Sequence, residues 1–106
     1  MSDALKHDGG KVPLHLLPAE SLVEIAKVLD FGAKKYAAHG WRHGMDWSRL
    51  NAALLRHLYA WQMGEDVDPE SGQLHLAHAG CCLLFLLSYQ KTGVGKDDRW
   101  PVEVRA

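Results

Sequence analysis

The stretch HLAHAGCCLLFLL, residues 75–87, decides the fold that this sequence predicts. Its run CCLLFLL, residues 81–87, is apolar on every side of a helix, so the stretch predicts a helix from about Gln73 to Gln90 that is central or lies in a subunit interface. Two histidines open the stretch at a spacing of three residues, which places His75 and His78 on the same helix face. That face continues along the apolar run, and we therefore expect both histidines to point inward.

Two further helices are predicted upstream of this run. The first extends from Pro18 to the segment 36–39, and the second from a cap at Asp46 or Ser48 to a break at Gly64. Apolar residues at helical spacing define the inner face of each helix. These residues are Leu22, Ile25, Ala26, Leu29 and Ala33 in the first helix, and Leu50, Ala53, Leu54, His57, Leu58 and Trp61 in the second. No segment has the alternation of a strand, so the predicted fold class is all-α.

The chain is predicted to be a single domain over residues 1–106. An irregular arm at 1–16 precedes a helical core at 17–91, and a second arm at 92–106 is expected to dock through Trp100. Three principal helices form a thin bundle with more apolar surface than one chain buries. Completion of the core as a homodimer or homotetramer is therefore expected.

Composition favours a soluble globular protein, with 47% hydrophobic and 24% charged residues and a net charge of −1. This near-neutral balance gives no overall attraction to nucleic acid or to a membrane surface. The start of the sequence lacks the apolar core of a signal peptide, and no apolar run approaches about 18 residues, so a cytoplasmic protein is expected. Cys81 and Cys82 are adjacent in an apolar run, which favours buried, reduced thiols over a disulfide or a metal site.

Acidic and histidine side chains are concentrated before and within the third helix. One interpretation of the acidic loop is a turn and a helix cap, with Asp68 as the best candidate. The other is a cation site, because four carboxylates within six residues repel one another. The inward histidines also have two interpretations. They are either core side chains bonded to the backbone or ligands of a metal ion. The candidate ligands are His57, Glu65, Glu70, His75 and His78, and Asp66 and Asp68 are further acidic candidates.

A second cluster combines basic and aromatic residues around the end of the first helix. Basic side chains neutralise phosphate, and aromatic faces stack on a nucleobase. The alternative is a solvated helix end whose rings pack at the edge of the core. The candidate substrate-binding residues are Lys34, Lys35, Tyr36, Trp41, Arg42, Arg49 and Arg56.

Several motifs together resemble a known family. They are L-L-P at 16–18, F-G-A-K-K-Y at 31–36, W-R-x-G at 41–44, R-H-L-x-A-W at 56–61, G-E-D-x-D-x-E-S-G at 64–72 and H-L-A-H-A at 75–79. From about Leu16 to Leu87 the chain is similar to the N-terminal domain of phage and prophage dATP/dGTP diphosphohydrolases. The resemblance implies a MazG-like all-α fold, cleavage of purine deoxynucleoside triphosphates with Mg²⁺ or Mn²⁺, and the cytoplasm of a phage-infected or prophage-bearing bacterial cell.

The sequence departs from the wider MazG-type pattern at the metal site. Those relatives hold the ion with E-x-x-E and a later E-x-x-D, whereas histidines stand at the corresponding places here. Mixed imidazole and carboxylate ligands suit Mn²⁺, Zn²⁺ or Ni²⁺ better. The predicted ion would activate water for attack on the α-phosphorus, with Asp66, Asp68 and Glu70 as catalytic carboxylates. The alternatives are a non-catalytic nucleotide-binding or regulatory module, and a structural oligomerisation domain.

Overall fold

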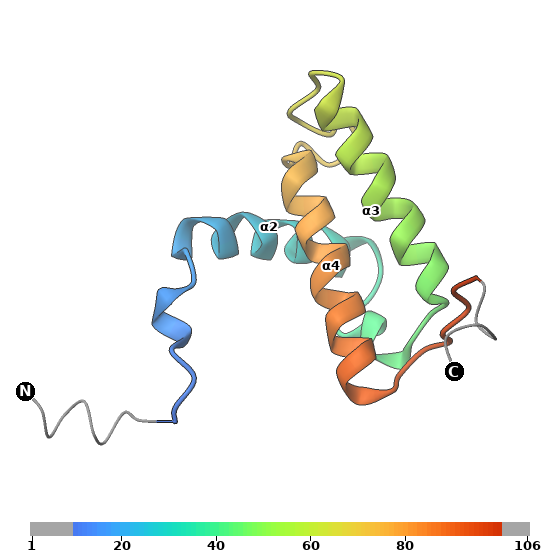
Figure 1. The fold of residues 1–106 in the computed structure, drawn as a ribbon. Helices are drawn as coiled ribbons and strands as arrows, with labels where there is room; N and C mark the ends of the chain where they lie inside the picture. The colour runs from blue at the N-terminus through green and yellow to red at the C-terminus, as the bar shows by residue number, and fades with distance from the viewer. Residues whose placement is uncertain (1–9, 101–106) are drawn as a thin grey trace, which may run out of the picture.

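The computed structural model describes residues 10–100, and its regular structure is helical (Figure 1). The three principal helices are α2 (Ala19–Lys35), α3 (Trp47–Gln62) and α4 (His75–Thr92), and two short 3-10 helices are η1 (Leu14–Leu16) and η2 (Gly40–His43). Between residues 10 and 100 the only β-type pairings are two isolated bridges. The predicted all-α class is therefore confirmed. Residues 1–9 and 101–106 of the predicted arms lie outside the described residues.

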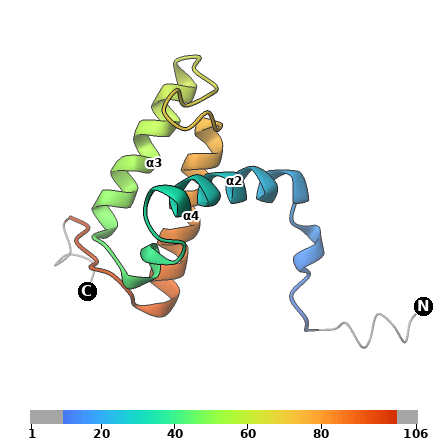
Figure 2. The same ribbon diagram turned by 180° about the vertical axis from the view of Figure 1, so that it is seen from behind.

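Helix α4 is the central element of the bundle. It runs beside α3 as the second half of a helical hairpin, and α2 crosses it on one face (Figures 1 and 2). This confirms the central position that its apolar run predicts. The N-terminal half of α2 extends beyond the hairpin, so only its later turns reach α4.

The core forms where α2 crosses α4. Val28, Ala77 and Cys81 are buried there, with Ile25 and Phe85 packed against them. Gly80 permits this close crossing, because a Cβ atom at its position would lie 2.9 Å from Ile25 Cδ1.

Part of the predicted inner face of α2 is wrong. Leu22, Ala26 and Leu29 are exposed, because the helix turns Ile25 and Val28 toward α4 and its first turns overhang the hairpin. The stripe predicted on α3 is confirmed from Leu50 to Leu58, whereas Trp61 at its end is 46% exposed.

The predicted helix caps are also corrected. Helix α4 begins after Leu74, close to the predicted start at about Gln73, and the amide of His75 donates to the carbonyl of Asp66 at 2.9 Å. Asp68 caps no helix. It forms the turn that was the other expectation, because its carboxylate accepts from the amide of Glu70 at 3.3 Å and from the hydroxyl of Ser71 at 3.0 Å.

The C-terminal arm docks, but not through Trp100, which is 88% exposed. Trp47 holds the arm instead. Its indole Nε1 donates to the carbonyl of Val94 at 3.0 Å, and its backbone amide donates to the carbonyl of Lys96 at 2.9 Å. Asp98 accepts from the backbone amide of Ser48 at 2.8 Å. Neither Asp46 nor Ser48 supplies the predicted side-chain cap.

Leucines on the outer side of α4 are open to solvent. Leu76, Leu83 and Leu87 are between 47% and 58% exposed. The predicted homodimer or homotetramer would have to cover such a surface, and it stays a prediction. None of the helices among residues 10–100 is long and apolar enough to cross a membrane.

Candidate functional site

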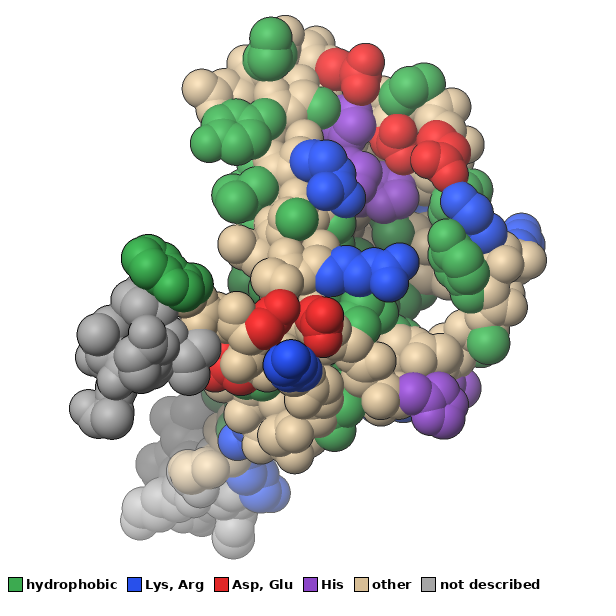
Figure 3. Space-filling view, turned by 90° about the vertical axis from the view of Figure 1, so that its right-hand side faces the viewer, with side chains coloured by type: hydrophobic (Ala, Val, Ile, Leu, Met, Phe, Trp, Pro, Cys, Tyr) green, Lys and Arg blue, Asp and Glu red, His purple; other side chains and the backbone are tan. Residues whose placement is uncertain are grey.

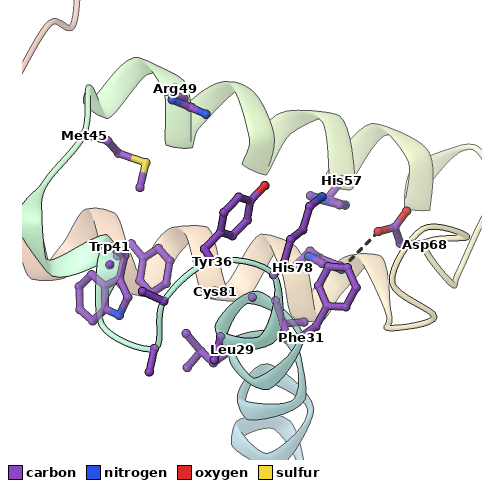
Figure 4. A pocket seen from close by; sticks show the side chains of 18 of the residues that line it. Leu29, Phe31, Tyr36, Trp41, Met45, Arg49, His57, Asp68, His78 and Cys81 are labelled. Atoms are coloured by element: carbon purple, nitrogen blue, oxygen red, sulfur yellow. Dashed lines mark ion pairs between the residues drawn. The ribbon is translucent and has the colours of Figure 1, made fainter.

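A cavity of about 900 Å³ opens between the end of α2, the segment around η2, and the α3–α4 hairpin (Figure 4). Basic, acidic and histidine side chains gather on this face of the molecule (Figure 3). Ten predicted site residues line the cavity: Lys35, Tyr36, Trp41, Arg49, Arg56, His57, Asp68, Glu70, His75 and His78. The fold therefore brings together residues of both predicted clusters.

Three cations contribute to the wall. Arg49 and Arg56 are seven residues apart on α3, so they project from similar sides of the helix, about 10.5 Å apart along its axis. Neither forms an ion pair with any residue among 10–100. Lys35 Nζ lies 2.7 Å from Glu70 Oε1, and this hydrogen bond and the charge of Glu70 raise the pKa of the lysine.

The two predicted aromatic contacts have different environments. Trp41 stacks on Phe85, with ring centroids 4.3 Å apart, and the guanidinium of Arg42 lies 4.5 Å from the same ring centroid. Since Phe85 covers one face of the indole, Arg42 must occupy the other. Tyr36 is 77% exposed and points its hydroxyl toward α3 (Figure 4). Lys35 Nζ lies 5.5 Å from the Tyr36 ring centroid, so the exposed face of this ring away from Lys35 is the one that can accept a planar ligand.

A hydrogen-bonded chain of three residues lies beside the cavity. Glu65 Oε1 is 2.6 Å from His75 Nε2, and His75 Nδ1 is 2.8 Å from His57 Nδ1. His75 is 4% exposed, which confirms the predicted inward orientation. His57 stacks on His78 with ring centroids 4.4 Å apart and planes inclined by 6°.

The third histidine belongs to a separate set of contacts. His78 Nε2 lies 2.6 Å from the Ser71 hydroxyl and 3.4 Å from Asp68 Oδ2 (Figure 4). The sequence-based site does not include Ser71. The feature of the sequence that could have identified Ser71 is its position three residues after Asp68, a spacing typical of turns that a side chain closes.

Burial and nearby imidazoles favour the neutral forms of His57 and His78. Burial lowers the pKa of His57, and the nearby imidazoles of His78 and His75 lower it further. Burial also lowers the pKa of His78, more than the carboxylate of Asp68 raises it. For Asp68, burial acts to raise the pKa, but the hydrogen bonds from Ser71 and the Glu70 amide lower it overall. The site thus combines the neutral imidazoles of His57 and His78 with the ionised carboxylate of Asp68.

Four predicted site residues do not line the cavity. Lys34 is turned to solvent and pairs with Asp30 at 3.1 Å, one helical turn earlier. Arg42 lies on Trp41, and Asp66 contributes its backbone carbonyl to the start of α4. Glu65 reaches the site only through His75.

The residues predicted to bind metal do not fit a shared ion in this arrangement. Among residues 10–100, no group of three His, Cys, Asp or Glu side chains has the geometry of a metal site. The nitrogens of His57 and His75 face each other at 2.8 Å, whereas two ligands of a tetrahedral zinc are about 3.3 Å apart. His78 is turned away toward Ser71. The bound divalent ion stays a prediction, and no chemical step below passes through it.

Fold and cavity together define a class of protein, a small all-α domain whose site combines cations, an open tyrosine and hydrogen-bonded histidines. The particular family follows from comparison with known proteins. The profile of the family described as dATP/dGTP diphosphohydrolase, N-terminal, matches residues 1–99, and the chain belongs to this family.

A curated relative agrees with this assignment. A protein of Salmonella phage PMBT28 named dATP/dGTP diphosphohydrolase is 36% identical over 101 residues, which cover 94% of this chain. The matched region is 34% of that relative, so the chain spans about a third of its length. No solved structure matches the chain.

Proposed function

We propose that this chain binds purine deoxynucleoside triphosphates and hydrolyses them to the monophosphate and pyrophosphate. The observation that carries the proposal is a cavity lined by Lys35, Arg49 and Arg56 together with the exposed Tyr36 and the neutral His57. Cations suit a triphosphate, an exposed ring suits a nucleobase, and a neutral imidazole suits an attacking water. The name of the phage relative supplies the purine preference.

The cavity suggests how the substrate lies. The base would rest against Tyr36, and the phosphates would extend along α3 between Arg49 and Arg56. With the triphosphate running from Arg56 toward Arg49, the α-phosphate would lie on the side of the histidines. The triphosphate enters as its Mg²⁺ complex, which is the form that such enzymes use.

Lys35 and Glu70 would change partners when the substrate binds. Their ion pair, at 2.7 Å, is solvent-exposed and therefore weak. A phosphate group offers Lys35 a more highly charged anion. Glu70 would then be released to face the Mg²⁺ that arrives with the triphosphate, which preserves a catalytic role for this predicted carboxylate.

A second candidate is a non-catalytic module that binds or sequesters the nucleotide. It is favoured by the match to only 34% of the phage relative, since the remainder of such a protein could carry the chemistry. This module would use the same cationic and aromatic wall.

Two measurements separate the candidates. Purified chain is incubated with each of the four deoxynucleoside triphosphates in Mg²⁺, Mn²⁺, Zn²⁺, Ni²⁺ or EDTA, and pyrophosphate is measured. Affinity for a non-hydrolysable dGTP analogue is measured by calorimetry. Pyrophosphate released from dATP and dGTP, and lost in EDTA, supports hydrolysis. Binding without turnover supports the module, and absence of both overturns the proposal.

Metal content of the protein as purified tests the predicted resident ion separately. One ion per chain would uphold the prediction made from the sequence. Absence of a tightly bound ion, combined with turnover in Mg²⁺, would leave only the ion that the substrate carries.

A further inference from the structure

We infer that Glu65 and His75 hold His57 in the tautomer whose Nε2 is unprotonated, which makes His57 a general base in the cavity. The use of this base on a phosphate chain rests on the proposed function, whereas the tautomer itself does not. The sequence suggests Glu65, His75 and His57 as metal ligands. In this arrangement the three side chains are linked to one another by hydrogen bonds.

The carboxylate of Glu65 fixes the first link of the chain. An ionised carboxylate only accepts hydrogen bonds, so the nitrogen 2.6 Å from Glu65 Oε1 must carry a proton. That nitrogen is Nε2 of His75. Because His75 is 4% exposed, its ring has no solvent to offer an alternative partner.

The second link follows from the first. A neutral imidazole that carries its proton on Nε2 has an accepting lone pair on Nδ1. His75 Nδ1 lies 2.8 Å from His57 Nδ1, so as long as His75 is neutral, His57 is the donor of this bond. With its proton on Nδ1, neutral His57 has an unprotonated Nε2.

This nitrogen is accessible from the cavity. His57 lines the cavity wall, and its Nε2 forms no hydrogen bond with any residue among 10–100. The described residues contain no buried side-chain nitrogen or oxygen without a partner, so His57 Nε2 must be in contact with solvent. A water molecule bonded there would be oriented to donate its proton to the ring.

The reaction step can be written in full. Water transfers a proton to His57 Nε2 while its oxygen bonds to the α-phosphorus, and the P–O bond to the β-phosphate breaks. The electron pair of that bond leaves on pyrophosphate. The positive charge that develops on His57 is stabilised through His75 by the carboxylate of Glu65, as in other carboxylate–histidine pairs. His57 is thus the catalytic residue, and Glu65 and His75 are positioning residues.

Tautomers are measured directly by long-range ¹H–¹⁵N correlation spectra of the chain labelled with ¹⁵N-histidine. The expected result is a proton on Nε2 of His75 and on Nδ1 of His57 at neutral pH. Loss of signals in a His57→Gln variant assigns the spectrum, and exposed His15 provides an unconstrained reference. A proton on Nε2 of His57, or on Nδ1 of His75, would overturn the inference.

Kinetics then test the role of the chain in turnover. Glu65→Gln removes the charge and retains the shape, and we expect kcat to fall at least about tenfold, a change of about 1.4 kcal/mol in the barrier. KM should stay within about twofold, because Glu65 does not line the cavity. Glu24→Gln, which alters a partly exposed pair with Lys27 outside the cavity, is the matched control. An unchanged kcat in Glu65→Gln would contradict the role of the chain, whereas absence of turnover in the unmodified protein would refute only the proposed function.

Discussion

Asp98 binds the first turn of α3 through Ser48, fifty residues earlier in the sequence. One carboxylate oxygen accepts the backbone amide of Ser48 at 2.8 Å, and the other accepts its hydroxyl at 2.5 Å. These hydrogen bonds lower the pKa of Asp98. The arm that follows α4 therefore supplies a cap that the residues before α3 do not provide.

Asp98→Ala is expected to destabilise the bundle by removing this cap. The urea midpoint should fall, because a donor in the first turn of α3 loses its carboxylate partner. Asp46→Ala is the matched control, since Asp46 occupies the cap position without a side-chain bond to the helix. Circular dichroism at 222 nm measures both variants. A larger loss in the control would show that the cap is assigned to the wrong residue.

Tyr89→Phe should test how the segment around η2 is fixed. The hydroxyl of Tyr89 donates to the carbonyl of Trp41, and this tyrosine is 1% exposed. Removal leaves the Trp41 carbonyl with the amide of Gly44 as its remaining donor, so the free energy of unfolding should fall by about 1 kcal/mol, the net value of one hydrogen bond. Tyr59→Phe provides the control, because Tyr59 is 61% exposed. Equal stability of the two variants in urea titrations would rule out a structural role for the Tyr89 hydroxyl.

Arg56→Ala should weaken nucleotide binding. Loss of one charge-assisted phosphate contact is expected to raise the Kd for a dGTP analogue about tenfold, or about 1.4 kcal/mol. Arg49→Ala is expected to act in the same direction, because it lines the same wall. Lys27→Ala, on the solvent side of α2, should stay within about twofold. If calorimetry gave the two arginine variants the same Kd as Lys27→Ala, the result would argue against a phosphate path along α3.

Stability should rise with pH across the range in which histidine titrates. Folding lowers the pKa of His57 and of His78 below their unfolded value of 6.5. The unfolded chain therefore binds more protons between the folded and unfolded values. This contribution is fully present above about pH 6.5 and is lost as the pH falls through the lower, folded pKa values.

Urea titrations between pH 5 and pH 8 measure this dependence. A His57→Gln variant serves as control, and its stability should change less steeply over the same range. A wild-type free energy of unfolding that increased toward acid pH would contradict the sign derived from burial of the imidazoles.

The two cysteines should react slowly in the folded protein. Burial and the neighbouring Cys82 raise the pKa of the Cys81 thiol to about 12, and burial raises that of Cys82. Only the thiolate attacks Ellman's reagent, so both should react much more slowly at pH 8 than in urea. The denatured chain gives the reference of two thiols. Rapid release of one equivalent from the native protein would place a thiol outside the core.

The sequence by itself determined the helices and the direction of the two histidines on α4. Both follow from a local property, because the helical period fixes which side chains share a face. His75 and His78 are therefore predictable from their spacing. The cluster of cations and acids was also visible, and most of its members line the cavity.

Only the tertiary structure decided how these side chains are paired. The spacing of His75 places it inward, but its partners Glu65 and His57 come from a loop and from another helix. The docking of the last arm by Asp98 instead of Trp100 is decided in the same way. A hydrogen bond depends on distances and angles between elements that the period of one helix does not contain, so the inward orientation of His75 was readable from the sequence and its partners were not.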